Sequence, residues 1–173
     1  MLKKSIIEEL NLQINRELTS SYIYLAMSAY CKANNMDGFA GWLKVQSEEE
    51  NEHAMKIYDY LNDLGIAVEL ESIKKPKSNY KNYIELFTAV VDQEIAITKN
   101  IEDLANLALK EKDNLTYNFL GWFLEEQVEE IALVTSILDK LKLIGENNNG
   151  LYMLDQELGK RGGDKKGSCG CDC

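Results

Sequence analysis

Residues 37–64, DGFAGWLKVQSEEENEHAMKIYDYLNDL, are the stretch that decides the fold class. Steps of three and four along this stretch select one helical face, made of Phe39, Leu43, Gln46, Glu50, His53, Ile57, Leu61 and Leu64. The face is apolar at both ends and is interrupted near its middle by Glu50 and His53, the only histidine of the chain. A buried ion costs several kcal/mol unless it is paired or binds a metal. The pattern therefore predicts a long amphipathic helix with a pair of metal-binding residue types on its buried face.

Three further stretches also combine an apolar helical face with a polar break near its middle. They are residues 5–34, 80–110 and 114–144. The breaks are, in the same order, Glu17, then Glu94, then Gln127 together with Glu130. We therefore expect four long helices of similar length.

Capping residues predict where these helices begin and end. Ser5 is expected to cap the first helix, with Glu8 completing a capping box, and Asp37 is expected to cap the second. Gly65 and Gly145 are expected to end the second and fourth helices.

The connection at residues 66–79 contains the only proline of the chain, Pro76, and has no helical periodicity. It is too long for a tight hairpin, but its extended length matches that of a helix of about thirty residues. The second and third helices are then parallel. We predict an all-α fold, an antiparallel four-helix bundle with one long crossover between the second and third helices. Residues 151–158 add a short fifth helix.

Composition limits the classes of partner. The formal charge of −10 argues against nucleic acid and anionic membranes as partners, and there is neither a membrane span nor a signal peptide pattern. Four cysteines without paired spacing predict no disulfide framework, which favours the cytoplasm. We expect one domain over residues 1–160 and a flexible Cys-rich tail over residues 161–173.

In the tail, Cys169, Cys171 and Cys173 place three thiols within five residues. They are expected either to bind a soft metal or to be incidental in an exposed extension. Cys31 lies on the apolar face of the first helix, where we expect a small core residue.

When four helices of similar length align, their midpoints share one layer, so the polar breaks should meet. Four carboxylates, one imidazole and one amide would then lie in a medium of low dielectric, where the carboxylates repel one another. Two cations would neutralise them, and this donor set suits iron or manganese, with zinc able to compete. The alternative is a helical scaffold whose buried polar layer sets the register without metal.

The spacing of these residues resembles the ferroxidase centre of the ferritin family, especially bacterial non-haem ferritins. The segments that carry the resemblance are Glu17-Leu18-x-Ser20-Ser21-x-x-Tyr24, Glu50-x-x-His53, Glu94, Phe119-Leu120-x-Trp122, Glu126-Gln127-x-Glu129-Glu130 and Gly150-Leu151-Tyr152. The resemblance extends over the chain to about residue 160.

The resemblance implies a role for each residue of the centre. Glu17, Glu50 and His53 would bind a first iron, with Glu50 bridging to a second. Glu94 and Glu130 would bind that second iron. Gln127 would be a hydrogen-bonding neighbour or a weak ligand.

Two further roles follow only from the resemblance. Glu49, Glu126 and Glu129 match a third iron site, although without the family they are equally a solvated edge. Tyr24 would hydrogen-bond near the centre and donate an electron, unless it is only a core residue.

The function implied is iron storage and detoxification, as a ferroxidase that oxidises Fe(II) with O2 or H2O2 and stores a ferric oxyhydroxide mineral. Members of the family assemble as cages of 24 subunits, and no haem is expected because Asn51 stands where bacterioferritins have the haem-binding methionine. The alternative enzyme is a di-iron oxidase or peroxidase of the rubrerythrin type. Those bundles use Glu-x-x-His twice, whereas this chain has a single histidine.

Overall fold

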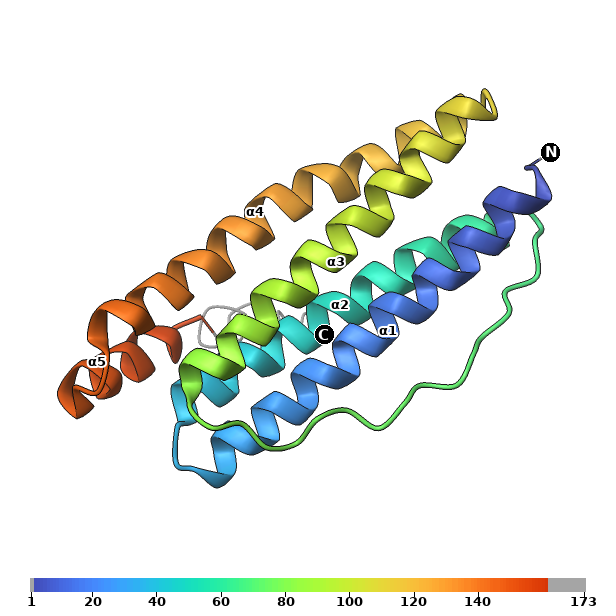
Figure 1. Ribbon diagram of the computed structural model, residues 1–173. Helices are drawn as coiled ribbons and strands as arrows, with labels where there is room; N and C mark the ends of the chain where they lie inside the picture. The colour runs from blue at the N-terminus through green and yellow to red at the C-terminus, as the bar shows by residue number, and fades with distance from the viewer. Residues whose placement is uncertain (1, 162–173) are drawn as a thin grey trace, which may run out of the picture.

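Five α-helices and no strand make up residues 2–161, the part of the chain that the computed structural model describes (Figure 1). They are α1 (Lys4–Ala33), α2 (Asp37–Asp63), α3 (Tyr83–Lys110), α4 (Asn114–Ile144) and α5 (Asn148–Leu158). Within these residues, none of the helices is long and apolar enough to cross a lipid bilayer. The predicted Cys169, Cys171 and Cys173 cluster lies outside the described residues.

The helices are connected with the predicted topology. α1 packs chiefly against α2, and α3 packs chiefly against α4, so the bundle consists of two helical hairpins. Residues 64–82 run along the outside of the bundle between the hairpins, and α2 and α3 consequently point in the same direction (Figure 1). α5 lies across one end of the bundle, next to α2 and α4. The predicted single-crossover four-helix bundle with a short fifth helix is confirmed.

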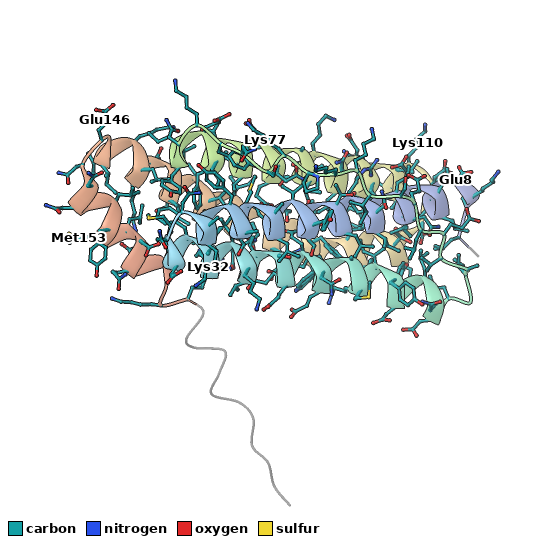
Figure 2. The ribbon with its side chains drawn as sticks, turned by 90° about the horizontal axis from the view of Figure 1, so that it is seen from below. Glu8, Lys32, Lys77, Lys110, Glu146 and Met153 are labelled. Carbon is teal, nitrogen blue, oxygen red and sulfur yellow. The ribbon has the colours of Figure 1, made fainter. Side chains whose placement is uncertain are left out.

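The core consists of two apolar clusters. One lies at the end covered by α5 and includes Met27, Cys31, Phe39, Phe87 and Leu141. The other lies toward the opposite end and includes Ile6, Leu10, Ile57, Ile101 and Phe123. Every long helix contributes to both clusters, and the polar breaks of all four fall between the two contributions. The packing therefore places a polar layer between two dry cores, while charged side chains such as Glu8, Lys110 and Glu146 project outward (Figure 2).

Two of the predicted helix caps are wrong. α1 has already begun at Lys4, because the amides of Ile6 and Ile7 both bond to the carbonyl of Lys3, which leaves Ser5 inside the first turn. α2 begins at Asp37 itself, and the Asp37 carboxylate pairs with Lys32 at 2.7 Å rather than with a backbone amide. Neither helix has a side-chain cap.

The remaining helix ends follow capping chemistry closely. α3 and α5 begin at Tyr83 and Asn148 rather than at the predicted residues 80 and 151. Their caps, together with that of α4, are Asn82, Asp113 and Asn147, each accepting a hydrogen bond from the amide three residues on. Gly65 and Gly145 end α2 and α4 with positive φ angles, as predicted.

One close contact fixes α5 against the start of α2. The buried carboxylate of Asp155 accepts a hydrogen bond from the amide of Phe39 at 3.0 Å, so it satisfies a free N–H in the first turn of α2. Gly38 permits this approach, because a Cβ there would lie 1.7 Å from the carbonyl oxygen of Asp155. The end of α5 is thereby brought beside α2, close to the polar layer.

Candidate metal centre

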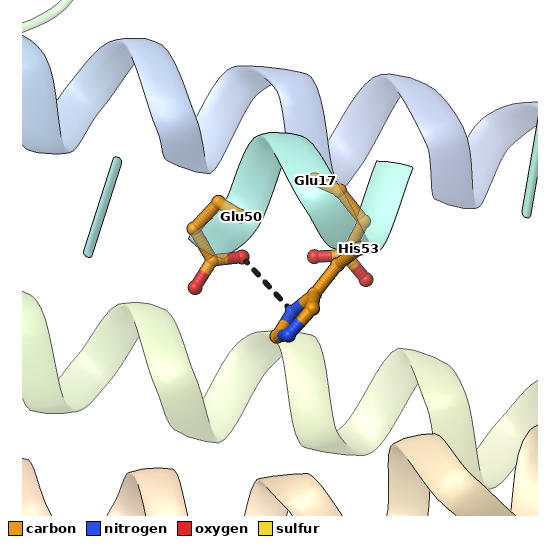
Figure 3. A group of neighbouring side chains, drawn as sticks. All are labelled: Glu17, Glu50 and His53. Atoms are coloured by element: carbon orange, nitrogen blue, oxygen red, sulfur yellow. Dashed lines mark ion pairs between the residues drawn. The ribbon is translucent and has the colours of Figure 1, made fainter. Parts of the chain in front are cut away.

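Glu17, Glu50 and His53 form the centre of the polar layer (Figure 3). Glu17 projects from the middle of α1, and Glu50 and His53 project one turn apart from α2. One potential ligand atom from each lies within 4.8 Å of the others, and all three side chains are buried. His53 Nδ1 and Glu50 Oε2 are 3.8 Å apart, which is too far for a hydrogen bond and leaves room for an ion.

Two oxygens of this group lack a hydrogen-bond donor among the described residues. Glu17 Oε2 and Glu50 Oε2 are buried and accept no hydrogen bond from any described residue. Buried polar atoms are normally satisfied, and a carboxylate oxygen without a donor calls for a bound cation or a proton. Hard carboxylate oxygens with one imidazole nitrogen fit iron or manganese, and also zinc.

Glu94 of α3 is held by donors from two other helices. One of its oxygens accepts a hydrogen bond from the Tyr24 hydroxyl, and the other accepts one from Gln127 Nε2 at 3.2 Å. Gln127 Nε2 also lies 3.0 Å from Thr98 Oγ1. The structure therefore places Tyr24 and Gln127 directly on Glu94, as hydrogen-bonding neighbours.

Glu130 of α4 is hydrogen-bonded to α2. Its Oε2 accepts a hydrogen bond of 2.7 Å from Gln46 Nε2, and Gln46 Oε1 in turn accepts one of 2.8 Å from Arg161. Gln13 has the corresponding position on α1, since it donates to Glu17 Oε1 at 2.7 Å and accepts from Arg16 at 3.1 Å. Each of these glutamines therefore links an arginine to a carboxylate of the centre.

The four carboxylates oppose one another's ionisation. Burial raises the pKa of Glu17 and of Glu130 to about 7, and Glu94 adds to both shifts through its charge. Burial, and then the charges of Glu17, Glu94 and Glu130, raise the pKa of Glu50 well above its usual value. Burial raises the pKa of Glu94 as well. Because ionisation of these four carboxyl groups is unfavourable, bound cations would stabilise their charged forms.

His53 is prepared to act as a neutral ligand. Burial lowers its pKa, and neutral imidazole is the form that binds metals. The ring is held edge-on between Trp122 and Phe123, with centroid separations of 5.4 and 6.0 Å. The Lys56 ammonium lies 4.2 Å from the centre of the Trp122 ring.

Of the three residues predicted to bind a third iron, two line one pocket and the third does not. Glu49 and Glu126 line a pocket of about 480 Å³ whose inner wall includes His53 and Glu130. Glu129 is exposed and does not line that pocket. The pocket therefore connects the inner centre to two of the three outer acids.

The sequence did not reveal two residues that contact the centre, Gln13 and Gln46, or a third, Arg161, that contacts Gln46. Gln13 lies four residues before Glu17, a helical spacing that could have revealed it. Gln46 was predicted to be on the buried face, but its bond to Glu130 was not. Arg161 follows α5 and carried no signal, because it reaches the centre only through the docking of that helix.

Comparisons with known proteins agree with this geometry. A family model described as a ferritin-like domain matches residues 7–144. The chain is 44% identical to a bacterial non-heme ferritin of Campylobacter jejuni over 91% of this chain and 95% of that protein. It is 39% identical to a bacterial non-heme ferritin of Staphylococcus aureus over 96% of this chain and all of that protein.

Solved structures give the same relationship. An open pore ferritin from Archaeoglobus fulgidus superposes with a TM-score of 0.91 at 41% identity, covering 92% of this chain and 98% of that one. A structure described as a humanized archaeal ferritin also gives a TM-score of 0.91, at 42% identity, covering 92% and 96% of the two chains.

Proposed function

The chain belongs to the ferritin family, and from this premise we infer that it stores iron and oxidises Fe(II) to Fe(III) at the centre between its four long helices. The observation that carries the inference is the pair of buried carboxylate oxygens, on Glu17 and Glu50, that no described protein group satisfies. Iron is the substrate and the cargo of such a protein rather than a retained cofactor.

The ligands divide into two sets around Glu50. Glu17, Glu50 and His53 would hold one iron, and their ligand atoms already lie within 4.8 Å of one another. Glu94 and Glu130 would hold the other iron, each with one oxygen already engaged by a protein donor. By its resemblance to ferritins, Glu50 would be the carboxylate shared between the two.

The same carboxylates supply the driving force for oxidation. Their negative charge stabilises Fe(III) more than Fe(II), and this difference lowers the potential of the bound pair. Each Fe(II) gives up one electron. Two electrons convert O2 and two protons to H2O2, or convert H2O2 and two protons to water.

The protein also limits how tightly the product is held. The position that would complete a second Glu-x-x-His unit on α4 is occupied by Glu130, three residues after Gln127, and the Gln127 amide is already bonded to Glu94 and Thr98. A centre with a single imidazole, whose neighbouring amide is already hydrogen-bonded, offers fewer strong ligands than one with two Glu-x-x-His units. Iron should therefore leave this centre after oxidation rather than remain there as a cofactor. This favours storage over a di-iron peroxidase of the rubrerythrin type.

We propose that the assembly is a cage of 24 subunits in the cytoplasm, with residues 1–160 as the folded domain and the segment from 161 as its extension. Large apolar side chains support assembly, because Val128, Leu143 and Met153 are each more than two-thirds exposed. The relatives from Archaeoglobus fulgidus include a ferritin described as having an open pore, which is a property of an assembled shell.

Aerobic addition of Fe(II) to the full chain tests the function. Iron should be oxidised well past about two ions per chain and remain in solution with the protein as mineral, whereas a di-iron oxidase stops near that number. Absorbance of the ferric product, followed by size-exclusion chromatography with iron analysis, distinguishes the two results.

Replacing one ligand tests the site. Glu50→Ala should keep the helices and the assembly but slow the initial oxidation by at least about tenfold, because it removes the carboxylate shared by both irons. Glu48→Ala is the matched control, since Glu48 is an exposed acid on the same helix. Equal initial rates for Glu50→Ala and the unmodified chain would contradict the assignment.

A further inference from the structure

Arg161, the last described residue, lies beside the metal centre although it follows α5. Its guanidinium is 4.9 Å above the ring of Trp42, donates to Gln46 Oε1 at 2.8 Å and donates to Glu49 Oε2 at 2.7 Å. The side chains of Arg161 and Glu49 are only 26% and 21% exposed. A half-buried guanidinium with an aromatic platform and two acceptors is held in place far better than a surface ion pair.

The carboxylate that Arg161 binds lies in the pocket outside the iron ligands. Glu49 lines this pocket together with Glu126 and with the ligands His53 and Glu130. The guanidinium therefore engages a carboxylate oxygen that a cation at the outer acids would use. An ion that takes Glu49 as a ligand must displace Arg161 from it or share the carboxylate with it.

Arg161 is also linked to the inner centre. A guanidinium can only donate hydrogen bonds, so it fixes the oxygen of the Gln46 amide toward itself. The nitrogen of that amide is then directed at Glu130 Oε2, 2.7 Å away. One arginine thus touches an outer acid directly and a proposed iron ligand through Gln46.

We propose that Arg161 is a built-in cation that occupies Glu49 and restricts binding of a third metal ion in the outer pocket. Entry of that ion releases the guanidinium from Glu49 and frees Gln46 to turn away from Glu130. Arg161 thereby couples the outer pocket to the inner pair of irons. The proposal rests on the proposed function, since it concerns a metal ion beyond the inner two.

Zinc is the probe that tests this proposal, because it binds the same donors without redox chemistry. Equilibrium dialysis and calorimetry on the assembled full chain should give two tight Zn²⁺ ions and one weaker ion per chain. In Arg161→Gln the third ion should bind about tenfold more tightly, since it no longer has to displace the Arg161 guanidinium from its ligand Glu49. In the double variant Arg161→Gln/Glu49→Gln this gain should disappear.

The control variant is Lys140→Gln. Lys140 pairs with Glu157 at 2.5 Å between α4 and α5, so this variant also removes one positive charge near α5 but does not touch the pocket. Its third ion should bind as in the unmodified chain. Arg161→Lys keeps the charge without the planar fork and should give an intermediate affinity, which preserves the test if Arg161→Gln does not fold.

The same measurements distinguish failure of the proposal for Arg161 from failure of the proposed function. If Arg161→Gln and Lys140→Gln bind the third ion with the same affinity as the unmodified chain, while both still bind two ions and oxidise iron, Arg161 is only an anchor for the end of α5. In that case the proposal is wrong and the proposed function stands. If the unmodified chain binds no Zn²⁺ at its inner acids and oxidises no iron, both fail together.

Discussion

Individual carboxylates decide what this protein can bind. Glu17 and Glu50 each place an oxygen in the interior with no described donor, and the neighbouring acids discourage ionisation further. Glu94 and Glu130 are fixed by amide or hydroxyl donors, and the other oxygen of Glu17 is fixed by the Gln13 amide. The centre therefore combines three oriented carboxylates with two oxygens, on Glu17 and Glu50, that have no described donor until a cation arrives.

The raised pKa values predict how pH acts on the metal-free protein. Burial raises the pKa of Glu17 and of Glu130 from 4.5 in the unfolded chain to about 7 in the folded chain, so the folded state binds more protons between these values. The stability they contribute is complete below about pH 4.5 and is lost as the pH rises through about 7, by at most about 3 kcal/mol for each carboxyl. The unfolding temperature of the metal-free chain should fall between about pH 5.5 and pH 8.

Zinc supplies the check on this pH dependence. Because a cation removes the cost of ionising the acids, the rise in unfolding temperature that Zn²⁺ causes should be larger at the higher pH. Differential scanning calorimetry with and without Zn²⁺ at the two pH values measures both effects. A zinc-induced rise that is the same at both would show that these carboxyls ionise normally in the folded chain.

At the scale of elements, the four long helices supply the proposed ligands, and α5 positions the residue that follows it, Arg161, near them. α5 packs through Asp155 onto the first turn of α2, and this contact needs a residue without a Cβ at position 38. The contact also delivers Arg161 to Gln46 and Glu49. The docking of one short helix thus influences a site formed by other helices.

Gly38→Ala tests the docking of α5. The added Cβ would overlap the Asp155 carbonyl, which is backbone and cannot rotate away, so α5 must shift. We expect a loss of about 1–3 kcal/mol in the free energy of unfolding, the usual cost of overpacking. Gly41→Ala on the same helix meets no atom within 4 Å and should stabilise the chain by up to about 1 kcal/mol. Urea unfolding followed by circular dichroism compares the two, and a similar gain from both variants would rule out the close contact.

The whole molecule presents a second apolar surface in addition to its core. A groove on α4 combines the apolar side chains of Val128, Ile131, Ala132 and Leu143 with four polar or charged residues, and Leu143 is 89% exposed. An exposed apolar surface of this kind marks an interface between proteins, and in a member of this family the natural partner is another copy of the chain.

Leu143→Lys tests that interface. A charge in the groove should leave the helical content of the subunit unchanged but shift the assembly toward smaller species, because the lysine must be desolvated on contact. Sedimentation velocity measures the size distribution, with Lys142→Gln as a neighbouring substitution outside the groove. An unchanged sedimentation coefficient for Leu143→Lys would remove this groove from the assembly surface.

By itself, the sequence determined the four helices, the crossover, the short fifth helix and the residues that break each apolar face, because helical periodicity is a local property of the chain. Tertiary structure alone decided the distances within the Glu17, Glu50 and His53 group, the glutamines that orient the acids, and the approach of Arg161. The cap predicted at Asp37 is wrong because its carboxylate pairs with Lys32 instead of with a backbone amide. Residues far apart in the chain meet only through packing, and no local pattern specifies which of several equally apolar faces will touch.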